Sequence, residues 1–581
     1  MKRLLSIICA AVLAAAAITG CDLPQGSNTS QKPATIDIVS PEESGCSVDY
    51  DESTRTLTIS GRGEFRPGDD PELQRALAAA TYPEKVVISP GITVLGEYCF
   101  SENEDEVVEG NHEDEVVEGN HFDRIKTIEI ADTVTAIEDF ALPSESLTSV
   151  KLPGKLVYLG SYAFSCCDKM TEIEIPGSVS TIPCNCFFGN KNLKRVVLGE
   201  GVAVIEDGAF DACDSLEELV LNDGLTVIAP CAFSDCERLS DIELPESLKI
   251  IGNNAFINCS AMKSVTIPES VEYIGRYAFG YNSYGEYFDE DTNRIEGFTI
   301  KGVRGSAAQT YARQNGFAFE DEDGNITTES EPAVARYEYD ENSGSLRVYG
   351  DGIISNPGDY DETVPWSKKD LDIKSVTVED GVTAVDEISF YAFQNNGVPL
   401  DACGRIETVK LSGSVRYIGG GAFYDCLSLR DISFENGLRF IESMAFDGCK
   451  SLKQISLPET VQYIDYSFGC CTGLESIDLS RTGVTSIDRV CSDCDSLKEV
   501  KLPDSLSAIG SGALMNCPSL KSITIPKSVR YIGPKAFGYY YVEKDGTDAI
   551  EKTDGFVVKG CKNTAAEQYA LDNGFGFEAM D

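Results

Sequence analysis

Leu147-Thr-Ser-Val-Lys-Leu-Pro153 and, 23 residues later, Met170-Thr-Glu-Ile-Glu-Ile-Pro176 are two copies of the pattern that decides the fold. In each copy apolar and polar residues alternate, which is typical of a short strand with one buried face. The proline then ends the strand because it cannot donate to a continuing ladder. A second apolar segment follows, from Leu156 in the first copy and from Val179 in the second, and then Ala-Phe or Cys-Phe.

The same unit recurs along the chain with a nearly fixed period. The leading apolar residue of the second segment stands every 23 residues in the first half, and in the second half one spacing is 22. These residues are Leu156, Val179, Val202, Leu225, Leu248 and Val271, and then Val415, Leu438, Val461, Val484, Leu506 and Val529. A unit this short cannot bury its apolar face alone, so the period predicts a solenoid in which each unit covers its neighbour.

The array is interrupted once and begins again with the same terminal patterns. A hairpin pattern opens each half, at residues 47–61 and 336–350. Each half closes with a strand pattern and then a helix, for which Ser306 and Thr564 are expected N-caps and Gly316 and Gly574 expected stops. The resulting organisation is a signal segment at 1–20, a flexible tether at 21–44, a solenoid at 45–320, an acidic linker at 321–333 and a second solenoid at 334–581.

These units resemble the BspA-like leucine-rich repeats of bacterial surface proteins. The resemblance covers most of residues 45–581. It implies a β-rich leucine-rich-repeat solenoid, with repeats of about 23 residues and a cap at the end of each array. Members of that family are mostly exported, and those with assigned roles tend to be adhesins that bind host or microbial surface components.

The N-terminus has the pattern of an export signal. Lys2 and Arg3 precede an apolar stretch, Leu4 to Ala17, that is too short to span a bilayer. The next residues, Ile18-Thr-Gly-Cys21, resemble the lipobox of bacterial lipoproteins, which implies that Cys21 carries the lipid anchor. An ordinary cleaved signal followed by a chance cysteine is the alternative. We expect a lipoprotein at the cell surface that touches the membrane through its anchor only.

The charge of the chain restricts its partners. Its 95 acidic residues outnumber 48 basic ones, for a formal net charge of −47. Such a surface repels nucleic acid and anionic lipid, and it favours solubility, cations or basic partners. We therefore expect no nucleic-acid partner.

Seven of the 21 cysteines occupy one place in the repeat, eleven residues after the leading apolar residue. They are Cys167, Cys213, Cys236, Cys259, Cys426, Cys449 and Cys517, with Cys494 in the shorter repeat and Asn190 and Thr472 as replacements. A position that accepts cysteine, asparagine or threonine indicates a ladder of small buried residues. Rungs about 5 Å apart permit disulfides, but a ladder directs side chains badly for bridging, so free thiols are favoured.

Residues capable of catalysis or metal binding are few. The only histidines, His112 and His121, lie in a duplicated acidic stretch at 104–121, which fits either a metal-chelating loop or a solvated insertion, and the second is favoured. Acidic runs at Asp289 and Asp321 resemble parts of a calcium loop but lack its full spacing. Cys491 and Cys494 have CxxC spacing without a second pair. We expect no enzyme, no cofactor and at most weak calcium binding at the acidic loops.

Two outward-facing stripes are candidates for a binding face. Val197 and Val220 occupy the outer position of two successive first strands, as an apolar contact patch would; ordinary strand propensity is the alternative. Tyr417, Phe440 and Tyr463 stand in register on three successive second segments. Exposed rings there would suit a protein or glycan partner, and cross-rung stacking explains the same pattern.

Together these features predict a monomeric surface lipoprotein that binds an extracellular protein or glycan through a solenoid face. The alternative is a structural spacer or assembly component of the cell envelope that has no host ligand.

Overall fold

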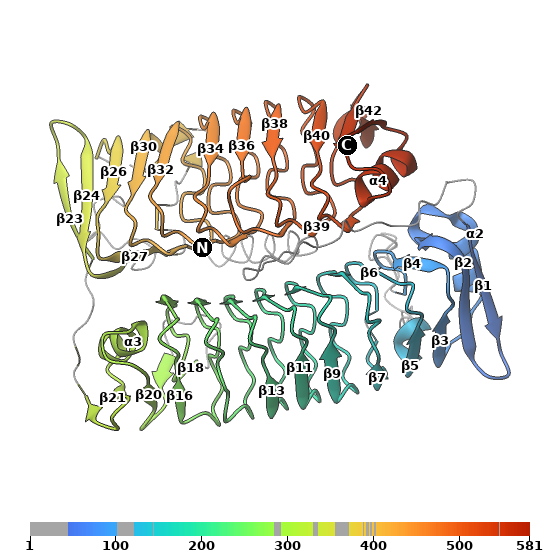
Figure 1. Cartoon of the computed structure of the whole chain (residues 1–581), viewed down its shortest axis with the longest axis horizontal. Coiled ribbons are helices and arrows are strands. Elements are labelled where there is room, and N and C mark those ends of the chain that lie inside the picture. The colour runs from blue at the N-terminus through green and yellow to red at the C-terminus, as the bar shows by residue number, and fades with distance from the viewer. Residues whose placement is uncertain are drawn as a thin grey trace, which may run out of the picture. The chain divides into compact units, whose positions relative to one another are not determined.

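A computed structural model describes residues 45–580, apart from 101–120, 143, 284–291, 329, 331–334, 355–370, 387–388, 391–393, 396–397, 400–402 and 545–546. The described chain forms two compact units, the first ending at residue 330 and the second beginning after it. Each unit is a solenoid built from two ladders of short parallel strands, coloured blue to green in the first unit and yellow to red in the second (Figure 1).

The first unit stacks the short strands of its repeats on two ladders, and the copy that begins at Leu239 adds a strand to the second ladder only. Its first ladder consists of β3 (Lys85–Ile88), β5 (Thr127–Ile130), β7 (Ser149–Val150), β9 (Glu172–Ile175), β11 (Arg195–Leu198), β13 (Glu218–Val220), β16 (Ser264–Thr266), β20 (Thr299–Lys301) and β21 (Ala318–Glu320). Its second ladder consists of β4 (Ile92–Leu95), β6 (Ala136–Ile137), β8 (Tyr158–Leu159), β10 (Thr181–Ile182), β12 (Val204–Ile205), β14 (Val227–Ile228), β15 (Ile250–Ile251) and β17 (Tyr273–Ile274). Val196 pairs with Ile173 and Leu219, so the sequence period sets the register.

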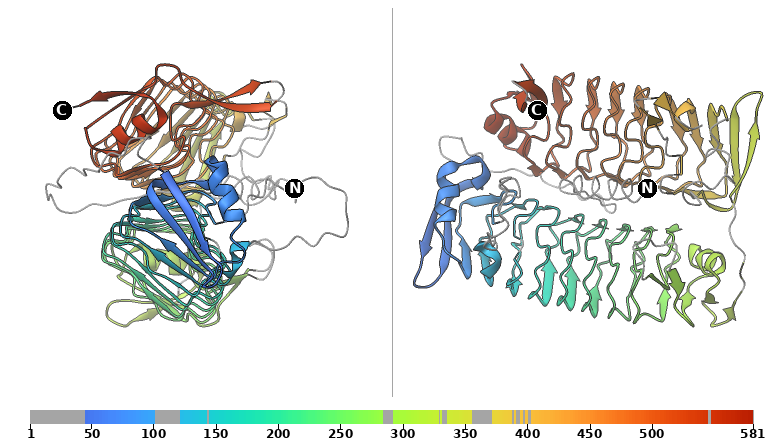
Figure 2. Two further views of the ribbon diagram at one scale, coloured as in Figure 1. Left: turned by 90° about the vertical axis from the view of Figure 1, so that its right-hand side faces the viewer. Right: turned by 180° about the vertical axis from the view of Figure 1, so that it is seen from behind.

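The second unit repeats this plan. Its first ladder consists of β26 (Ser375–Val378), β30 (Thr408–Leu411), β32 (Asp431–Phe434), β34 (Gln454–Ser456), β36 (Ser476–Asp478), β38 (Glu499–Lys501), β40 (Ser522–Thr524), β44 (Val557–Gly560) and β45 (Gly576–Ala579). Its second ladder consists of β25 (Gly352–Ile354), β27 (Val382–Val385), β31 (Tyr417–Ile418), β33 (Phe440–Ile441), β35 (Tyr463–Ile464), β37 (Ser486–Ile487), β39 (Ala508–Ile509) and β41 (Tyr531–Ile532). In Figure 2 the rungs of each unit stack along its own axis.

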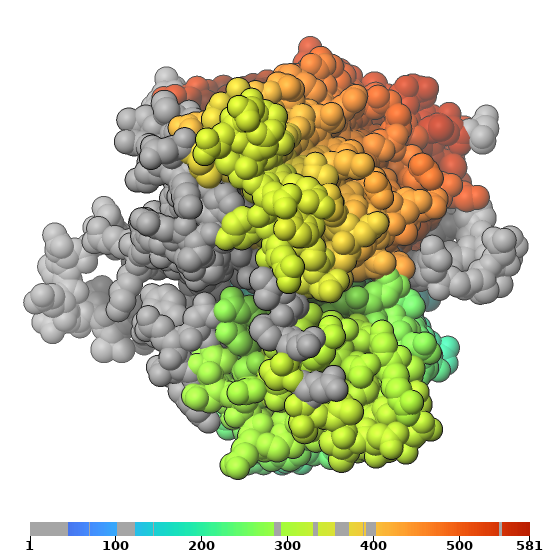
Figure 3. All heavy atoms as spheres, turned by 90° about the vertical axis from the view of Figure 1, so that its left-hand side faces the viewer, coloured from blue at the N-terminus to red at the C-terminus, as the bar shows by residue number. Residues whose placement is uncertain are grey.

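Antiparallel hairpins and short helices complete the ends of the units. A hairpin opens each unit, β1 (Gly45–Asp51) with β2 (Thr56–Phe65), and β23 (Ala335–Asp340) with β24 (Ser345–Gly350). β2 and β24 also pair in parallel with the first strands of the ladders. The atoms of β23 and β24 cover one end of the second core (yellow-green in Figure 3). The other elements are η1 (Pro67–Asp69), α2 (Pro71–Ala78), η3 (His121–Arg124), β18 (Tyr281–Ser283), β19 (Thr292–Arg294), β22 (Ile326–Thr327), β28 (Gln394–Asn395), β29 (Val398–Pro399), η5 (Cys403–Arg405), β42 (Tyr539–Lys544) and β43 (Thr547–Lys552).

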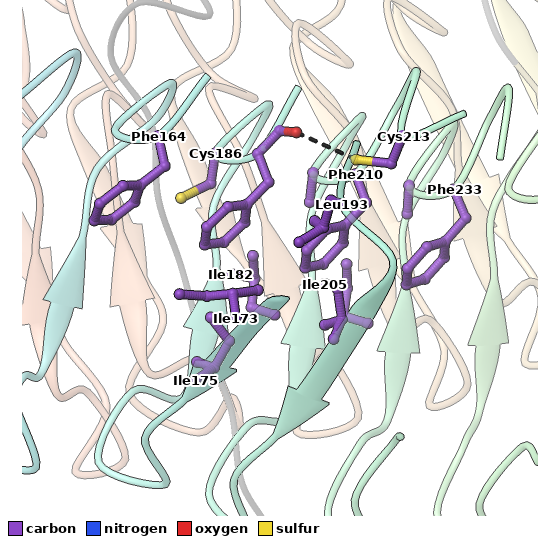
Figure 4. Packing of buried hydrophobic residues seen from close by; sticks show 14 of the residues in the cluster. Phe164, Ile173, Ile175, Ile182, Cys186, Leu193, Ile205, Phe210, Cys213 and Phe233 are labelled. Carbon is purple, nitrogen blue, oxygen red and sulfur yellow. Dashed lines mark hydrogen bonds between the residues drawn. The ribbon is translucent and has the colours of Figure 1, made fainter. Parts of the chain in front are cut away.

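A column of phenylalanine rings runs through each core. The first column contains Phe164, Phe187, Phe210, Phe233, Phe256 and Phe279, whose neighbouring ring centroids lie 4.8 to 5.6 Å apart with interplanar angles of 12° or less. Isoleucines and leucines of both ladders pack beneath these rings, as Figure 4 shows for Ile173, Ile182 and Ile205. The rings therefore stack once per rung, and the buried apolar core is continuous from rung to rung.

Each corner beside this column uses left-handed backbone. From Phe164 to Phe256, the residues two before and two after the core phenylalanine have positive φ, for example Cys231 (52°) and Asp235 (57°) around Phe233. Met444 (57°) and Gly448 (73°) flank Phe446 in the same way. Left-handed backbone strains residues that have a Cβ, so glycine suits these positions best. Asparagine and aspartate also tolerate them, because their short polar side chains can form local hydrogen bonds.

A helix closes each core, α3 (Ala307–Asn315) in the first unit and α4 (Ala565–Asn573) in the second. The Ser306 hydroxyl, expected to accept from the first turn of the helix, instead donates to the Val303 carbonyl at 2.6 Å. Thr564 donates in the same way to Cys561. The chain leaves α3 through Gly316, whose φ is 66°. Among the described residues, no helix is long and apolar enough to cross a membrane.

Candidate binding surfaces

The predicted valine pair lies on the solvent side of the first ladder. Val197 of β11 and Val220 of β13 are register partners, so their side chains stand next to each other. Val220 is 39% exposed, and Val197 is half-buried. Arg195 runs beside them and pairs with Glu218 at 3.0 Å and with Glu174 at 3.8 Å. The outcome is a small apolar surface bordered by an ion-pair ladder.

The ladder stops beside Val220, a feature that sequence reasoning missed. The next rung, residues 240–244, forms no strand, and none of its main-chain groups bonds to a main-chain group of another described residue. Within the described chain β13 pairs only with β11, and β16 pairs only with β20. The pattern Ser240-Asp-Ile-Glu-Leu-Pro matches the other repeats, so the sequence gives no signal of this interruption.

The expectation of an exposed aromatic stripe on the second ladder is wrong for this structure. Tyr417, Phe440 and Tyr463 are 0%, 1% and 4% exposed. Their rings stack at 5.2 Å and then 4.3 Å, because register places equivalent rings at the rung spacing and each covers the face of the next. The Tyr417 hydroxyl also donates to Glu442. These three rings therefore stabilise the second ladder by stacking across its rungs, which is the alternative explanation of the sequence pattern.

The cysteine ladder is buried, and its thiols have partners. Cys213 Sγ donates to the Phe187 carbonyl at 3.4 Å, the bond drawn in Figure 4. Cys236, Cys259, Cys426, Cys449 and Cys494 make the equivalent bond to the phenylalanine 26 or 36 residues earlier. Asn190 fills the same role by donating to the carbonyls of Phe164 and Phe187. Each side chain thus satisfies a buried carbonyl at the corner.

One assignment in this ladder is corrected. Cys471, rather than Thr472, occupies the buried position and donates to the Phe446 carbonyl at 3.2 Å. The corner of this rung is one residue shorter, since Phe468 follows Phe446 by 22 residues. All 19 cysteines of the described chain are free thiols. Burial raises the pKa of Cys167 to about 12, which keeps this thiol protonated.

The CxxC pair also belongs to the core. Cys494 donates to the Phe468 carbonyl and Cys517 donates to the Cys491 carbonyl, so Cys491 stands where other rungs have phenylalanine. The side chains of Cys491 and Cys494, the two cysteines of the CxxC pair, are fully buried. In the described chain no group of three or more His, Cys, Asp or Glu side chains has the geometry to hold a metal.

The acidic run at Asp321 is a closed turn. Asp321 accepts from the amides of Asp323 and Asn325, and Arg304 donates to it at 2.7 Å. Desolvation opposes ionisation, but these bonds outweigh it and lower the pKa of Asp321 to about 2. Arg304 also bonds to Asp323, so one guanidinium pairs with two carboxylates of this run.

Several predicted features lie outside the described residues. They are the signal segment, Cys21, the tether, His112, most of the duplicated stretch at 104–121, and the start of the run at Asp289. His121 begins η3.

An acidic corner in the second unit holds a carboxyl group with a shifted pKa. Asp447 is 6% exposed, and its burial is the main cause that raises its pKa to about 6. The Cys470 thiol, which bonds to it, opposes this shift, whereas the neighbouring Asp425 carboxylate adds to it. The corner therefore changes charge in mildly acidic solution.

The repeat geometry agrees with one family model. The BspA type leucine-rich repeat region matches at residues 117–237, 203–296, 368–465, 399–491 and 466–544, in six copies. These ranges cover more than half of the chain. The chain belongs to the BspA-type leucine-rich-repeat family. That membership confirms the predicted fold, a β-rich solenoid of leucine-rich repeats.

Solved structures of bacterial leucine-rich-repeat proteins are similar to this BspA-type chain. A leucine-rich repeat protein from Bacteroides ovatus is 19% identical, covering 92% of this chain and 98% of its own, with a TM-score of 0.29. A leucine rich cell surface protein from Faecalibacterium prausnitzii is 21% identical, covering 81% and 96%, with a TM-score of 0.22. The pneumococcal vaccine antigen PcpA is 15% identical, covering 94% and 99%, with a TM-score of 0.20. Comparison with curated proteins gives no match.

Proposed function

We propose that this BspA-type protein is a cell-surface lipoprotein that binds an extracellular protein or glycan through the outer face of a solenoid and does no catalysis. The observation that carries the proposal is the first ladder of the first unit. There a closely packed apolar core presents Val197 and Val220 to solvent beside the Arg195 ion pairs. An apolar centre with a charged rim is the usual composition of a recognition surface.

Rigidity supports this role. Side chains on a packed ladder lose little conformational freedom when a ligand binds, so less of the binding free energy is lost to ordering. Membership of a family built from exposed repeat faces agrees with binding rather than with chemistry. A monomer is expected, because a hairpin opens each solenoid and a helix closes it, so that neither end of a core needs a second chain to cover it.

The anchor is a separate part of the proposal and rests on Ile18-Thr-Gly-Cys21. We expect native cells to incorporate labelled palmitate into the protein and to retain it in the membrane fraction. Cys21→Ser should abolish the label, because serine has no thiol to carry the thioether-linked acyl chains of a stable anchor. Labelled, membrane-bound Cys21→Ser protein would contradict the anchor.

The binding function is tested with the full mature chain on a panel of matrix proteins, mucins and cell-wall glycans. Specific, saturable binding to at least one class is expected, and binding to none contradicts the proposal. Recovery of envelope proteins alone from native membranes would instead favour the structural spacer. Val220→Lys serves as the surface variant, because Val220 is exposed and its replacement leaves the core intact.

A further inference from the structure

We propose that the first ladder of the first unit carries a docking surface for a protein partner that places basic side chains around an apolar one. The inference rests on the proposed binding function and names the class of its partner. The surface consists of the two outward side chains on each of four consecutive rungs, and we call it the acidic patch. Its residues are Glu172 and Glu174, Arg195 and Val197, Glu218 and Val220, and Asp241 and Glu243.

Strand register arranges these side chains in two rows along the ladder. The register pairs are Glu172 with Arg195 and Arg195 with Glu218 in one row, and Glu174 with Val197 and Val197 with Val220 in the other. Asp241 and Glu243 continue the rows one repeat later. Equivalent side chains on neighbouring strands stand side by side. The second row is therefore a pair of valines between two glutamates.

The patch exposes both its apolar centre and its charged rim. Val220 is 39% exposed, and Val197 is half-buried. The side chain of Glu174 is 80% exposed, and Asp241 and Glu243 are exposed as well. An apolar centre within a solvated polar rim is the composition of a protein-binding surface.

Carboxylates in the patch outnumber the cations that could pair with them. Five of its eight side chains are acidic, and Arg195 is its one cation. Arg195 serves Glu218 at 3.0 Å and Glu174 at 3.8 Å. Within the described chain, Glu172 and Glu243 form no ion pair. Like charges on neighbouring rungs repel each other, so cations supplied by a partner would relieve this repulsion.

This composition is confined to the patch. The equivalent positions on the two rungs before it and the two described strands after it are Thr127, Glu129, Ser149, Lys151, Ser264, Thr266, Thr299 and Lys301, with one carboxylate and no apolar side chain. In the second unit, β32 to β38 carry Asp431, Ser433, Gln454, Ser456, Ser476, Asp478, Glu499 and Lys501 there, again without an apolar side chain. The general acidity of the chain therefore does not explain the patch.

Charge complementarity selects the class of partner. Neutral and acidic glycans supply no cations, and nucleic acid and anionic lipid are repelled by the carboxylates. Lysine and arginine supply the cations, and their aliphatic stems also cover apolar surface such as Val197 and Val220. The patch therefore fits a basic protein surface with an apolar side chain at its centre.

The test uses the full mature chain and labelled peptides of one length, with binding measured by fluorescence anisotropy. The probe peptide has two central leucines flanked by lysines on both sides. One control peptide replaces the leucines with serine and keeps the charge, and another replaces the lysines with glutamate and keeps the apolar pair. The probe should bind more tightly than either control. Added sodium chloride should weaken its binding, because the ion pairs are exposed to solvent.

Paired variants separate the patch from the general acidity of the chain. Glu174→Gln combined with Glu243→Gln should weaken probe binding about fivefold, because two exposed carboxylates lose their lysine partners. Asp431→Asn combined with Glu499→Gln makes the same change of charge at exposed positions on the first ladder of the second unit. This control should bind the probe within about twofold of wild type, because salt screens charges distant from the bound peptide.

Matched valine variants test the apolar centre. Val220→Thr keeps a β-branched side chain but replaces a methyl group with a hydroxyl group, so it should weaken binding of the leucine probe about threefold. Binding of the serine peptide should not change. Val87→Thr makes the same replacement at the equivalent outward position of β3, outside the patch, and should affect neither peptide.

Three results would overturn the inference: no preference for the leucine probe over both control peptides, an equal loss in the two paired charge variants, or wild-type affinity for the leucine probe in Val220→Thr. The proposed function fails separately, when the wild-type chain binds no member of the protein and glycan panel. Binding of a panel glycan that the patch variants weaken would keep the function and overturn only the basic protein partner.

Discussion

Cysteine side chains in this protein act as small hydrogen-bond donors inside the core, which makes their reactivity predictable. Fourteen of the described cysteines are buried, and the other five are Cys46, Cys166, Cys231, Cys470 and Cys561. A thiol reagent should label Cys166, Cys231 and Cys561 most readily in the native protein and the fourteen only after denaturation, because the thiolate is the reactive form and needs solvent. Cys46 and Cys470 should react slowly, because burial raises their pKa to about 11 and about 12. Mass spectrometry of labelled peptides makes the measurement. Disulfide-linked ladder peptides in the unreduced protein would contradict it.

At Asp447 burial links stability to pH. Its folded pKa is raised from 3.8 to about 6, so between these values the folded state holds a proton that the unfolded state has lost. Stability therefore falls as pH rises through this window, by on the order of 2–3 kcal/mol for this group. Asp447→Asn should flatten that part of the curve, measured as urea unfolding free energy from pH 4 to 7. An unchanged slope would exclude Asp447 as its source, and Asp431→Asn, at an exposed position, is the control.

At the scale of elements, one tyrosine fastens each closing helix. Tyr311 Oη donates to the Phe279 carbonyl at 2.9 Å and accepts from the Phe279 amide at 2.9 Å. Tyr569 makes the same pair of bonds with Phe537 in the second unit. Tyr311→Phe should cost about 1–3 kcal/mol, because two buried main-chain groups lose their partner. Urea denaturation checks the loss. Tyr541→Phe, at an exposed hydroxyl, should fall within about 0.5 kcal/mol of wild type.

Periodic elements were predictable from the sequence, whereas local departures from the period were not. Val196 and its equivalents repeat because each rung must bury the same face, and that constraint is visible in the residues themselves. The unpaired rung at 240–244 depends on main-chain geometry, which its ordinary sequence does not reveal. Tyr417 illustrates a second limit. Register predicts that its ring aligns with Phe440, but alignment alone does not distinguish an exposed stripe from a buried stack.

At the scale of the whole molecule, the two solenoids have separate cores. One hydrophobic cluster runs from Leu57 to Phe319 and the other from Leu346 to Ala570, and no described residue belongs to both. A solenoid is stabilised by neighbouring rungs, so damage to one rung should weaken its own array. Phe210→Ala removes the ring between Phe187 and Phe233 and should cost the first unit about 3–5 kcal/mol.

The equivalent change in the second unit is Phe446→Ala, which removes the ring between Phe423 and Phe468. We expect calorimetry of the full chain to resolve two transitions, with Phe210→Ala lowering the midpoint of one and Phe446→Ala lowering the other. The two cores are separate, so each solenoid should unfold as its own cooperative unit. A chain with two such units shows two transitions rather than one. The double variant should show both shifts with additive size. A single transition that both variants move together would mean that the two arrays unfold as one cooperative unit.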